Sequence, residues 1–195
     1  MPTYPRSEME EMMERWLEAN RQAEQHGDWS TYLSPFYEKT AEYRWNMGPN
    51  QECVFQGRDE IRDVALGYHM KGFEKWHYPY HTILIDEKRG TVIGLYDQIS
   101  PTGVTVAGIS GSWFEYGGNY QWRSQRDFFD LSNVKAVIFQ MAGESQLEPI
   151  VKQKIHDQAS GKLLPGIQRL SEERSICAKV NDFLAMLKIV IFGRY

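Results

Sequence analysis

Two histidines in the stretch WHYPYH, residues 76–81, are well suited to proton transfer. On a strand, His77 and His81 would share a face about 13 Å apart, which is too far for one zinc ion with ligands at about 2 Å. We therefore expect no metal site. A single histidine can act as acid or base, because its ordinary pKa is near neutrality. We favour His81, deeper in the strand, over His77 at its mouth. The alternative is a structural histidine at a rim.

The stretch EYRWNMG, residues 42–48, alternates in character along the chain. On a strand, Tyr43 and Trp45 would point to one face, and charged or amide side chains would point to the other. A large aromatic face either packs into a core or lines a pocket for a flat ligand. Both interpretations remain open from the sequence.

Further candidate binding groups follow later in the chain. Tyr80 and Tyr96 carry phenolic hydroxyl groups, and Ser110 and Ser112 carry small hydroxyls two positions apart, on a face that Phe114 continues. Each hydroxyl can donate and accept a hydrogen bond, so these groups are expected to contact either a ligand or one another.

The last predicted strand and the first predicted helix add two more polar candidates. Trp122, Ser124 and Arg126 alternate with other residues, so we expect one shared face, on which Arg126 could hold an anionic or phenolate group. The alternative is that Arg123, Arg126 and Asp127 only make surface ion pairs. Asn20 interrupts the apolar stripe of the helix, and a buried amide must find a partner in a ligand or in the backbone.

Composition limits the classes of protein that fit. The chain has 195 residues, 42% of them hydrophobic, a formal net charge of −4 and no run of Lys or Arg, so we expect one globular domain with additions and no nucleic-acid partner. We also expect no signal peptide and no membrane partner, since the longest apolar stretch is too short to span a bilayer. Cys53 and Cys177 lie far apart and read as reduced thiols of a cytoplasmic protein.

Hydrophobic periodicity and turn signals predict an α+β order of elements. We expect helices over residues 8–26, from 34, and over 57–70, 134–145 and 165–192, with strands over 41–48, 53–56, 77–86, 91–100, 104–116 and 120–131. The expected fold is a curved antiparallel sheet that forms a cone, with the N-terminal helices around an internal pocket. We expect residues 1–145 to form this cone and residues 146–195 to form a helical C-terminal extension, acting as a lid or a dimer arm.

The segments AEYRWNMGP, FQGRDEIR, YHTILIDEKRGTVIG and SGSWFEYGGNYQW, in this order and spacing, resemble the nuclear transport factor 2-like (NTF2-like) superfamily in its SnoaL-like branch. The resemblance covers roughly residues 10–140. It implies a cone with a cavity. The superfamily includes ketosteroid isomerases, polyketide cyclases and dehydratases, most of which need no cofactor, as well as members that only bind ligands or proteins.

The functional residues of these relatives carry over incompletely. The resemblance aligns the general-base Asp of the isomerases with or beside Trp45, their tyrosine on the first helix with Asn20, and their later acidic residue near Ser112. The dehydratase-like relatives use a histidine on the strand that here contains His77 and His81. Asp97 and Asp130 are the other carboxylates that could replace the missing base.

We therefore predict a cofactor-independent lyase or isomerase that performs elimination, dehydration or deformylating C–C cleavage on a bulky aromatic or polycyclic molecule. The alternative is a non-catalytic ligand-binding or dimeric interaction protein of the same fold, and in either case we expect a homodimer. The expected proton-transfer residues are His81, Tyr43 and Tyr96. The expected substrate contacts are Asn20, Trp45, His77, Tyr80, Ser112, Phe114, Trp122 and Arg126.

Overall fold

The computed structural model describes residues 4–48 and 50–171 and the separate residues 175, 177, 180, 181, 183–185 and 187. Its helices are α1 (Arg6–His26), α2 (Trp29–Leu33), η1 (Ser34–Phe36), α3 (Arg58–Glu60), η2 (Ile61–His69), α4 (Leu131–Gly143) and α5 (Pro149–Ala159). Its strands are β1 (Tyr37–Gly48), β2 (Gln51–Gln56), β3 (Tyr80–Asp86), β4 (Thr91–Tyr96), β5 (Ser110–Gly118), β6 (Gln121–Phe128) and β7 (Ile167–Arg169).

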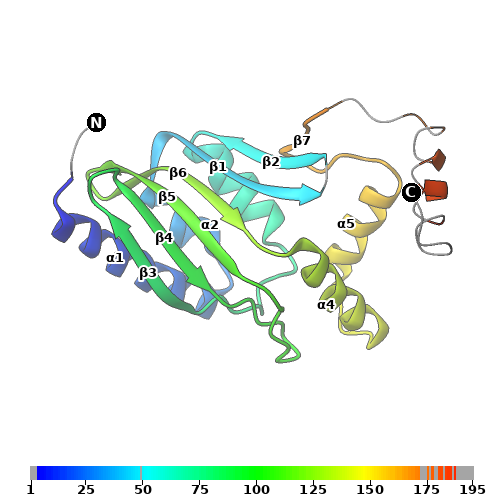
Figure 1. The fold of residues 1–195 in the computed structure, drawn as a ribbon. Helices are drawn as coiled ribbons and strands as arrows, with labels where there is room; N and C mark the ends of the chain where they lie inside the picture. Colours follow the sequence, from blue (N-terminus) through cyan, green and yellow to red (C-terminus); the bar gives the residue numbers. More distant parts are fainter. Residues whose placement is uncertain are drawn as a thin grey trace.

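The strands form one bent sheet in the order β3-β4-β5-β6-β1-β2-β7. Figure 1 shows the sheet curving over α1 and α2, with α4 and α5 beyond one end of it. The predicted α+β cone is therefore confirmed. One detail differs from the expected antiparallel sheet, because β1 and β6 pair in parallel. At this pair β6, the last of the consecutive antiparallel strands β3 to β6, lies beside β1, the first strand of the chain.

Helix α1 matches the predicted first helix and supplies the base of the core. Its apolar stripe, which includes Met9, Met13 and Trp16, is buried, and Gly27 ends the helix in the left-handed conformation at φ 65°. The indole of Trp16 meets the rings of Phe36, Tyr37, Phe114 and Trp122 edge-on, which is a favourable arrangement for aromatic pairs. α1 is thereby fixed across the concave face of the sheet.

A β-bulge in β6 changes which residues face the interior. Tyr116 pairs with Trp122 while Glu115 pairs with Ser124, so one step along β5 corresponds to two steps along β6 and Arg123 is the extra residue. Beyond the bulge, the inward positions are Gln125 and Asp127 rather than Ser124 and Arg126. The predicted alternation of Trp122, Ser124 and Arg126 on one face is therefore wrong after Trp122.

The C-terminal part of the described chain differs most from expectation. Helix α4 lies where the 134–145 helix was predicted, and Asp130 caps it by accepting hydrogen bonds from the Ser132 and Asn133 amides. Helix α5 lies within the predicted helical extension over residues 146–195, although no separate helix with its bounds was predicted. Residues 167–169, expected to be helical, form β7 and pair with β2. The described residues 177, 180, 181, 183–185 and 187 are helical, and the rest of the predicted 165–192 helix beyond residue 171 lies outside the described residues.

One buried lysine ties α5 to the cone. The Lys154 ammonium group donates hydrogen bonds to the backbone carbonyls of Tyr68 (2.7 Å), His69 (3.0 Å) and Lys71 (2.8 Å), at the C-terminal end of η2. These carbonyls lie at the negative end of the helix dipole, where the chain no longer continues as a helix, and the Tyr68 carbonyl also accepts from the Lys71 amide (3.3 Å). The ammonium group therefore satisfies both the hydrogen-bonding and the charge requirement of that helix end.

Candidate functional site

A cavity of about 420 Å³ lies between the concave face of the sheet and the helices. Its walls come from α1, α2 and η2, from inward side chains of β1, β3, β4, β5 and β6, and from α4 and α5. Its volume lies in the usual range of about 300–1,000 Å³ for small-molecule sites. The lining is mostly apolar and aromatic, with a cluster of polar groups on the sheet.

Asp127 is the centre of that polar cluster. One carboxylate oxygen accepts a hydrogen bond from the Tyr43 hydroxyl, and the other accepts from Ser112 Oγ (2.5 Å) and Gln125 Nε2 (2.7 Å). Gln125 in turn accepts a hydrogen bond from the Tyr37 hydroxyl through its Oε1. The carboxylate is thus oriented by three donors from three different strands.

The surroundings of Asp127 adjust its acidity in two opposing ways. Burial raises the pKa of the carboxyl group above its ordinary value, while the hydrogen bonds from Gln125, Ser112 and Tyr43 lower it, and burial dominates. Burial, followed by the charge of Asp127, also raises the pKa of Tyr43 and Tyr96 well above the ordinary value for phenols. The carboxyl group is therefore a stronger base than an exposed one, and the two phenols stay protonated as donors.

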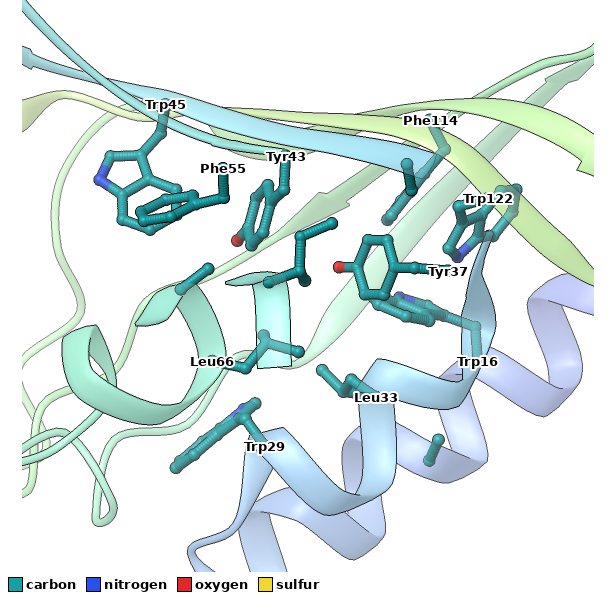
Figure 2. Packing of buried hydrophobic residues seen from close by; sticks show 14 of the residues in the cluster. Trp16, Trp29, Leu33, Tyr37, Tyr43, Trp45, Phe55, Leu66, Phe114 and Trp122 are labelled. Atoms are coloured by element: carbon teal, nitrogen blue, oxygen red, sulfur yellow. The ribbon is translucent and has the colours of Figure 1, made fainter. Parts of the chain in front are cut away.

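Aromatic rings surround this polar cluster. Figure 2 shows the hydroxyl groups of Tyr37 and Tyr43 directed into the space between the sheet and the helices that carry Leu66 and Trp29. The Tyr43 ring lies 5.0 Å from that of Trp45, and the rings of Tyr80 and Tyr96 are also 5.0 Å apart. A planar ligand in this space would meet rings on several sides and a carboxylate at one edge.

His69 is a further cavity residue that the sequence analysis missed. Its Nε2 lies 2.7 Å from the Pro165 carbonyl, which can only accept, so Nε2 carries the proton and Nδ1 is an acceptor. Burial lowers the pKa of His69 to about 4. The ring is therefore neutral at physiological pH. His69 lies in the last turn of the helix predicted over residues 57–70, whereas the predicted site histidines belong to the strand that follows it.

Six of the residues predicted as site residues line the cavity together: Asn20, Tyr43, Trp45, Tyr80, Tyr96 and Ser112. Tyr43 and Trp45 are both packed and cavity-facing, so the two interpretations of their strand are compatible. The Asn20 amide donates to the Trp16 carbonyl (2.9 Å), which leaves its oxygen to accept from another group.

The structure places the other predicted residues elsewhere. The His81 side chain is 51% exposed outside the cavity lining, and His77 is exposed and lies 3.2 Å from a Glu24 oxygen. Phe114 and Trp122 are completely buried and stack on each other with centroids 4.5 Å apart. They belong to the core behind the cavity rather than to its lining.

The bulge in β6 explains the positions of Arg126 and Asp127. Arg126 lies on the outer face of the sheet, where it pairs with Glu52 at 2.6 Å. The surface ion pair expected for Asp127 is wrong, because the bulge at Arg123 turns Asp127 into the cavity. No regular period-two pattern reveals this carboxylate.

The described part of the chain contains neither a cluster of metal ligands nor a membrane-spanning helix. Across residues 4–48 and 50–171 and the later described residues, no group of three His, Cys, Asp or Glu side chains is arranged to hold a metal ion. Among the helices in these same ranges, none combines the length and the apolar character needed to cross a membrane.

Comparison with known proteins defines the class of fold. No family model matches the sequence, and no curated protein matches it. Bal32a, encoded by a soil-derived mobile gene cassette, is 19% identical with a TM-score of 0.51, and the match covers 66% of this chain and 97% of that one. An NTF2-like protein from Cytophaga hutchinsonii is 14% identical, with a TM-score of 0.43 and coverages of 64% and 91%. A protein of the SnoaL-like family from Agrobacterium tumefaciens is 12% identical, with a TM-score of 0.47 and coverages of 64% and 98%.

The likeness to Bal32a extends over almost all of that protein but leaves about a third of this chain outside the match. At this level of identity the comparison shows the fold alone. The likeness to Bal32a agrees with the predicted cone, and the solved structures similar to this chain include proteins described as NTF2-like and SnoaL-like. Function has to be argued from the cavity.

Proposed function

We propose that this protein is a cofactor-independent enzyme that converts a small aromatic molecule in the cavity by proton transfer to and from Asp127. One observation carries the proposal: a carboxylate with a pKa raised by burial lies in an aromatic-lined cavity and is held in place by three side-chain donors. Such a group is positioned and adjusted for general acid–base catalysis.

The reaction class that fits is an elimination or isomerisation. Asp127 removes a proton from a substrate carbon or hydroxyl, and the electron pair of the broken bond forms a new double bond. In an elimination the leaving group then departs with the proton that the protonated Asp127 returns to it. The cavity phenols of Tyr80 and Tyr96 can donate hydrogen bonds to charge that develops on a substrate oxygen.

A second candidate function is ligand binding without chemistry. Both oxygens of Asp127 already accept hydrogen bonds from protein donors, and such bonds favour the charged form of the carboxyl group and make it a weaker base. In that case the cavity would hold an aromatic ligand in the same orientation, and Asp127 would serve only to order the polar wall.

The test is turnover and binding of a panel of phenolic and polycyclic compounds by wild type, Asp127→Asn and His81→Ala. Asparagine keeps the shape of the side chain, and the Tyr43 hydroxyl can rotate to accept from its amide. We expect Asp127→Asn to lower kcat by about 10²–10⁴-fold with little change in Kd, while His81→Ala retains activity. Binding without turnover in wild type would favour the second candidate, and activity lost only in His81→Ala would contradict the role of Asp127.

We also propose that the chain forms a homodimer through the outer face of the sheet. Leu84, Ile93 and Trp113 follow one another across three neighbouring strands, and Leu84 and Trp113 are exposed on that face. Contiguous exposed apolar side chains of this kind commonly mark an interface. Light scattering of wild type and Trp113→Glu tests this: we expect a dimer that the substitution converts to a monomer, and a monomeric wild type would contradict it.

A further inference from the structure

The cavity has two chemically different ends. The end inside the cone carries the polar cluster around Asp127, Ser112 and Gln125, together with tyrosine hydroxyls. The outer end is formed by the C-terminal helices. From α4 and α5 its apolar lining residues are Leu131, Val134, Ile138, Phe139, Val151 and Ile155. A ligand that fills the cavity therefore meets hydrogen-bonding groups at one end and hydrocarbon at the other.

The apolar end is a preformed wall. Val134 and Val151 also belong to a second buried cluster that includes Trp76, Val106 and Met141, which packs α4 and α5 against loops of the cone. The three hydrogen bonds from Lys154 to the end of η2 fix α5 in the same place. The apolar side chains are therefore in position before any ligand enters, which reduces the entropic cost of binding.

A large aromatic side chain is exposed at the rim of the α4–α5 end. Phe139 lines the cavity, yet it is 60% exposed. Two polar side chains, Lys135 and Gln158, lie beside it in the cavity lining. Lys154 also lines the cavity, but its ammonium group already donates three hydrogen bonds to backbone carbonyls. The α4–α5 end thus offers a ligand much apolar area and few free polar partners.

We propose that the α4–α5 end of the cavity is a binding subsite for the hydrocarbon arm of an amphiphilic ligand, whose hydroxyl-bearing ring lies at Asp127. The proposal rests on the proposed function, because the polar end must hold the ring. The apolar wall and the polar cluster line one continuous cavity, so a single ligand with an apolar arm and a polar ring matches both ends. The ligand class is a phenol, or a similar ring, that carries an alkyl or isoprenoid-like chain.

The experiment measures the binding of 4-alkylphenols with chains from methyl to octyl, using the fluorescence of the cavity tryptophans, among them Trp45. In wild type we expect affinity to rise about fourfold per methylene until the apolar end is filled. Phe139→Ser should reduce this increase for long chains and leave 4-methylphenol unchanged. The matched control is Leu84→Ser, which removes an exposed apolar side chain on β3 outside the cavity lining.

The outcomes separate this proposal from the function on which it rests. If Asp127→Asn loses turnover of the compound panel but the affinity of wild type for 4-alkylphenols does not rise with chain length, the subsite is refuted and the role of Asp127 stands. If affinity rises with chain length and this increase is reduced in Phe139→Ser, but Asp127→Asn keeps full turnover, the subsite stands and the role of Asp127 fails. The proposal would be overturned if affinity did not depend on alkyl chain length in wild type but rose with chain length in Phe183→Ser. That result would mean that the C-terminal segment around Phe183 occupies the apolar end.

Discussion

The neutral, buried ring of His69 makes the stability of the fold depend on pH. Burial lowers the pKa of His69 from 6.5 to about 4 in the folded protein, while the unfolded chain keeps the ordinary value. Between these pH values the unfolded chain binds a proton that the folded chain does not. The free energy of unfolding therefore rises as pH increases from about 4 to 6.5 and falls on acidification through the same range.

The size of this contribution follows from the shift. The difference of 6.5 − 4 = 2.5 pKa units corresponds to roughly 3.4 kcal/mol at about 1.36 kcal/mol per unit. The ring is partly open to solvent through the cavity, which screens the charge, so we expect about 2–3 kcal/mol. Replacing His69 by glutamine keeps a donor for the Pro165 carbonyl and removes the titration.

Urea denaturation of wild type and His69→Gln at a series of pH values from 4 to 7.5 measures this difference directly. Between pH 7.5 and 4 the free energy of unfolding should fall by about 2–3 kcal/mol more in wild type than in His69→Gln, because only wild type takes up a proton at this position on unfolding. The matched control is His81→Gln, which removes a half-exposed ring outside the cavity. Parallel pH profiles for wild type and His69→Gln, or the same change in His81→Gln, would refute the reasoning.

Three further predictions concern the buried charges and the close packing of the C-terminal segment. Lys154→Met should lower the free energy of unfolding by about 3 kcal/mol in urea, because three backbone carbonyl groups lose a charged donor. Gly166→Ala should cost about 2 kcal/mol more than Gly161→Ala, since both have positive φ but only the first would place a Cβ 2.1 Å from a Phe55 ring atom; equal costs would contradict the packing. Asp127→Asn should melt at a higher temperature than wild type at neutral pH, because burial raises the pKa of the carboxyl group and its charge destabilises the fold once the pH exceeds the folded pKa. That difference should disappear at a pH below the ordinary value of 3.8, and an equal or lower melting temperature at neutral pH would argue against a costly buried charge.

The sequence predicts the elements whose burial repeats regularly. The stripe of α1, with Met9, Met13 and Trp16, has helical spacing, and the inward face of β5, with Ser112 and Phe114, has a period of two. Local patterns of this kind depend on neighbouring residues, so they can be recognised without knowing the rest of the fold. The resemblance to a known cone then supplies their order in the sheet.

Features that depend on distant parts of the chain were not predictable in this way. A bulge at Arg123 reverses the faces of β6, so the period-two pattern hides the one carboxylate at the centre of the polar cluster, Asp127. β7 is three residues long and exists because it pairs with β2, more than a hundred residues earlier in the chain. His69 lines the cavity because Pro165 meets it from the same distant segment. None of these has a local signal.

The short strand β7 also covers a sheet edge that could otherwise pair with another chain. Its pairing with Gln51, Glu52 and Cys53, extended by the bond from the Val54 amide to the Gly166 carbonyl, covers the outer backbone edge of β2. An uncovered strand edge offers unpaired amides and carbonyls to any other chain, and such edges nucleate aggregation. A chain cut before residue 166 would leave this edge open, so newly made protein is vulnerable until its last described strand has been synthesised.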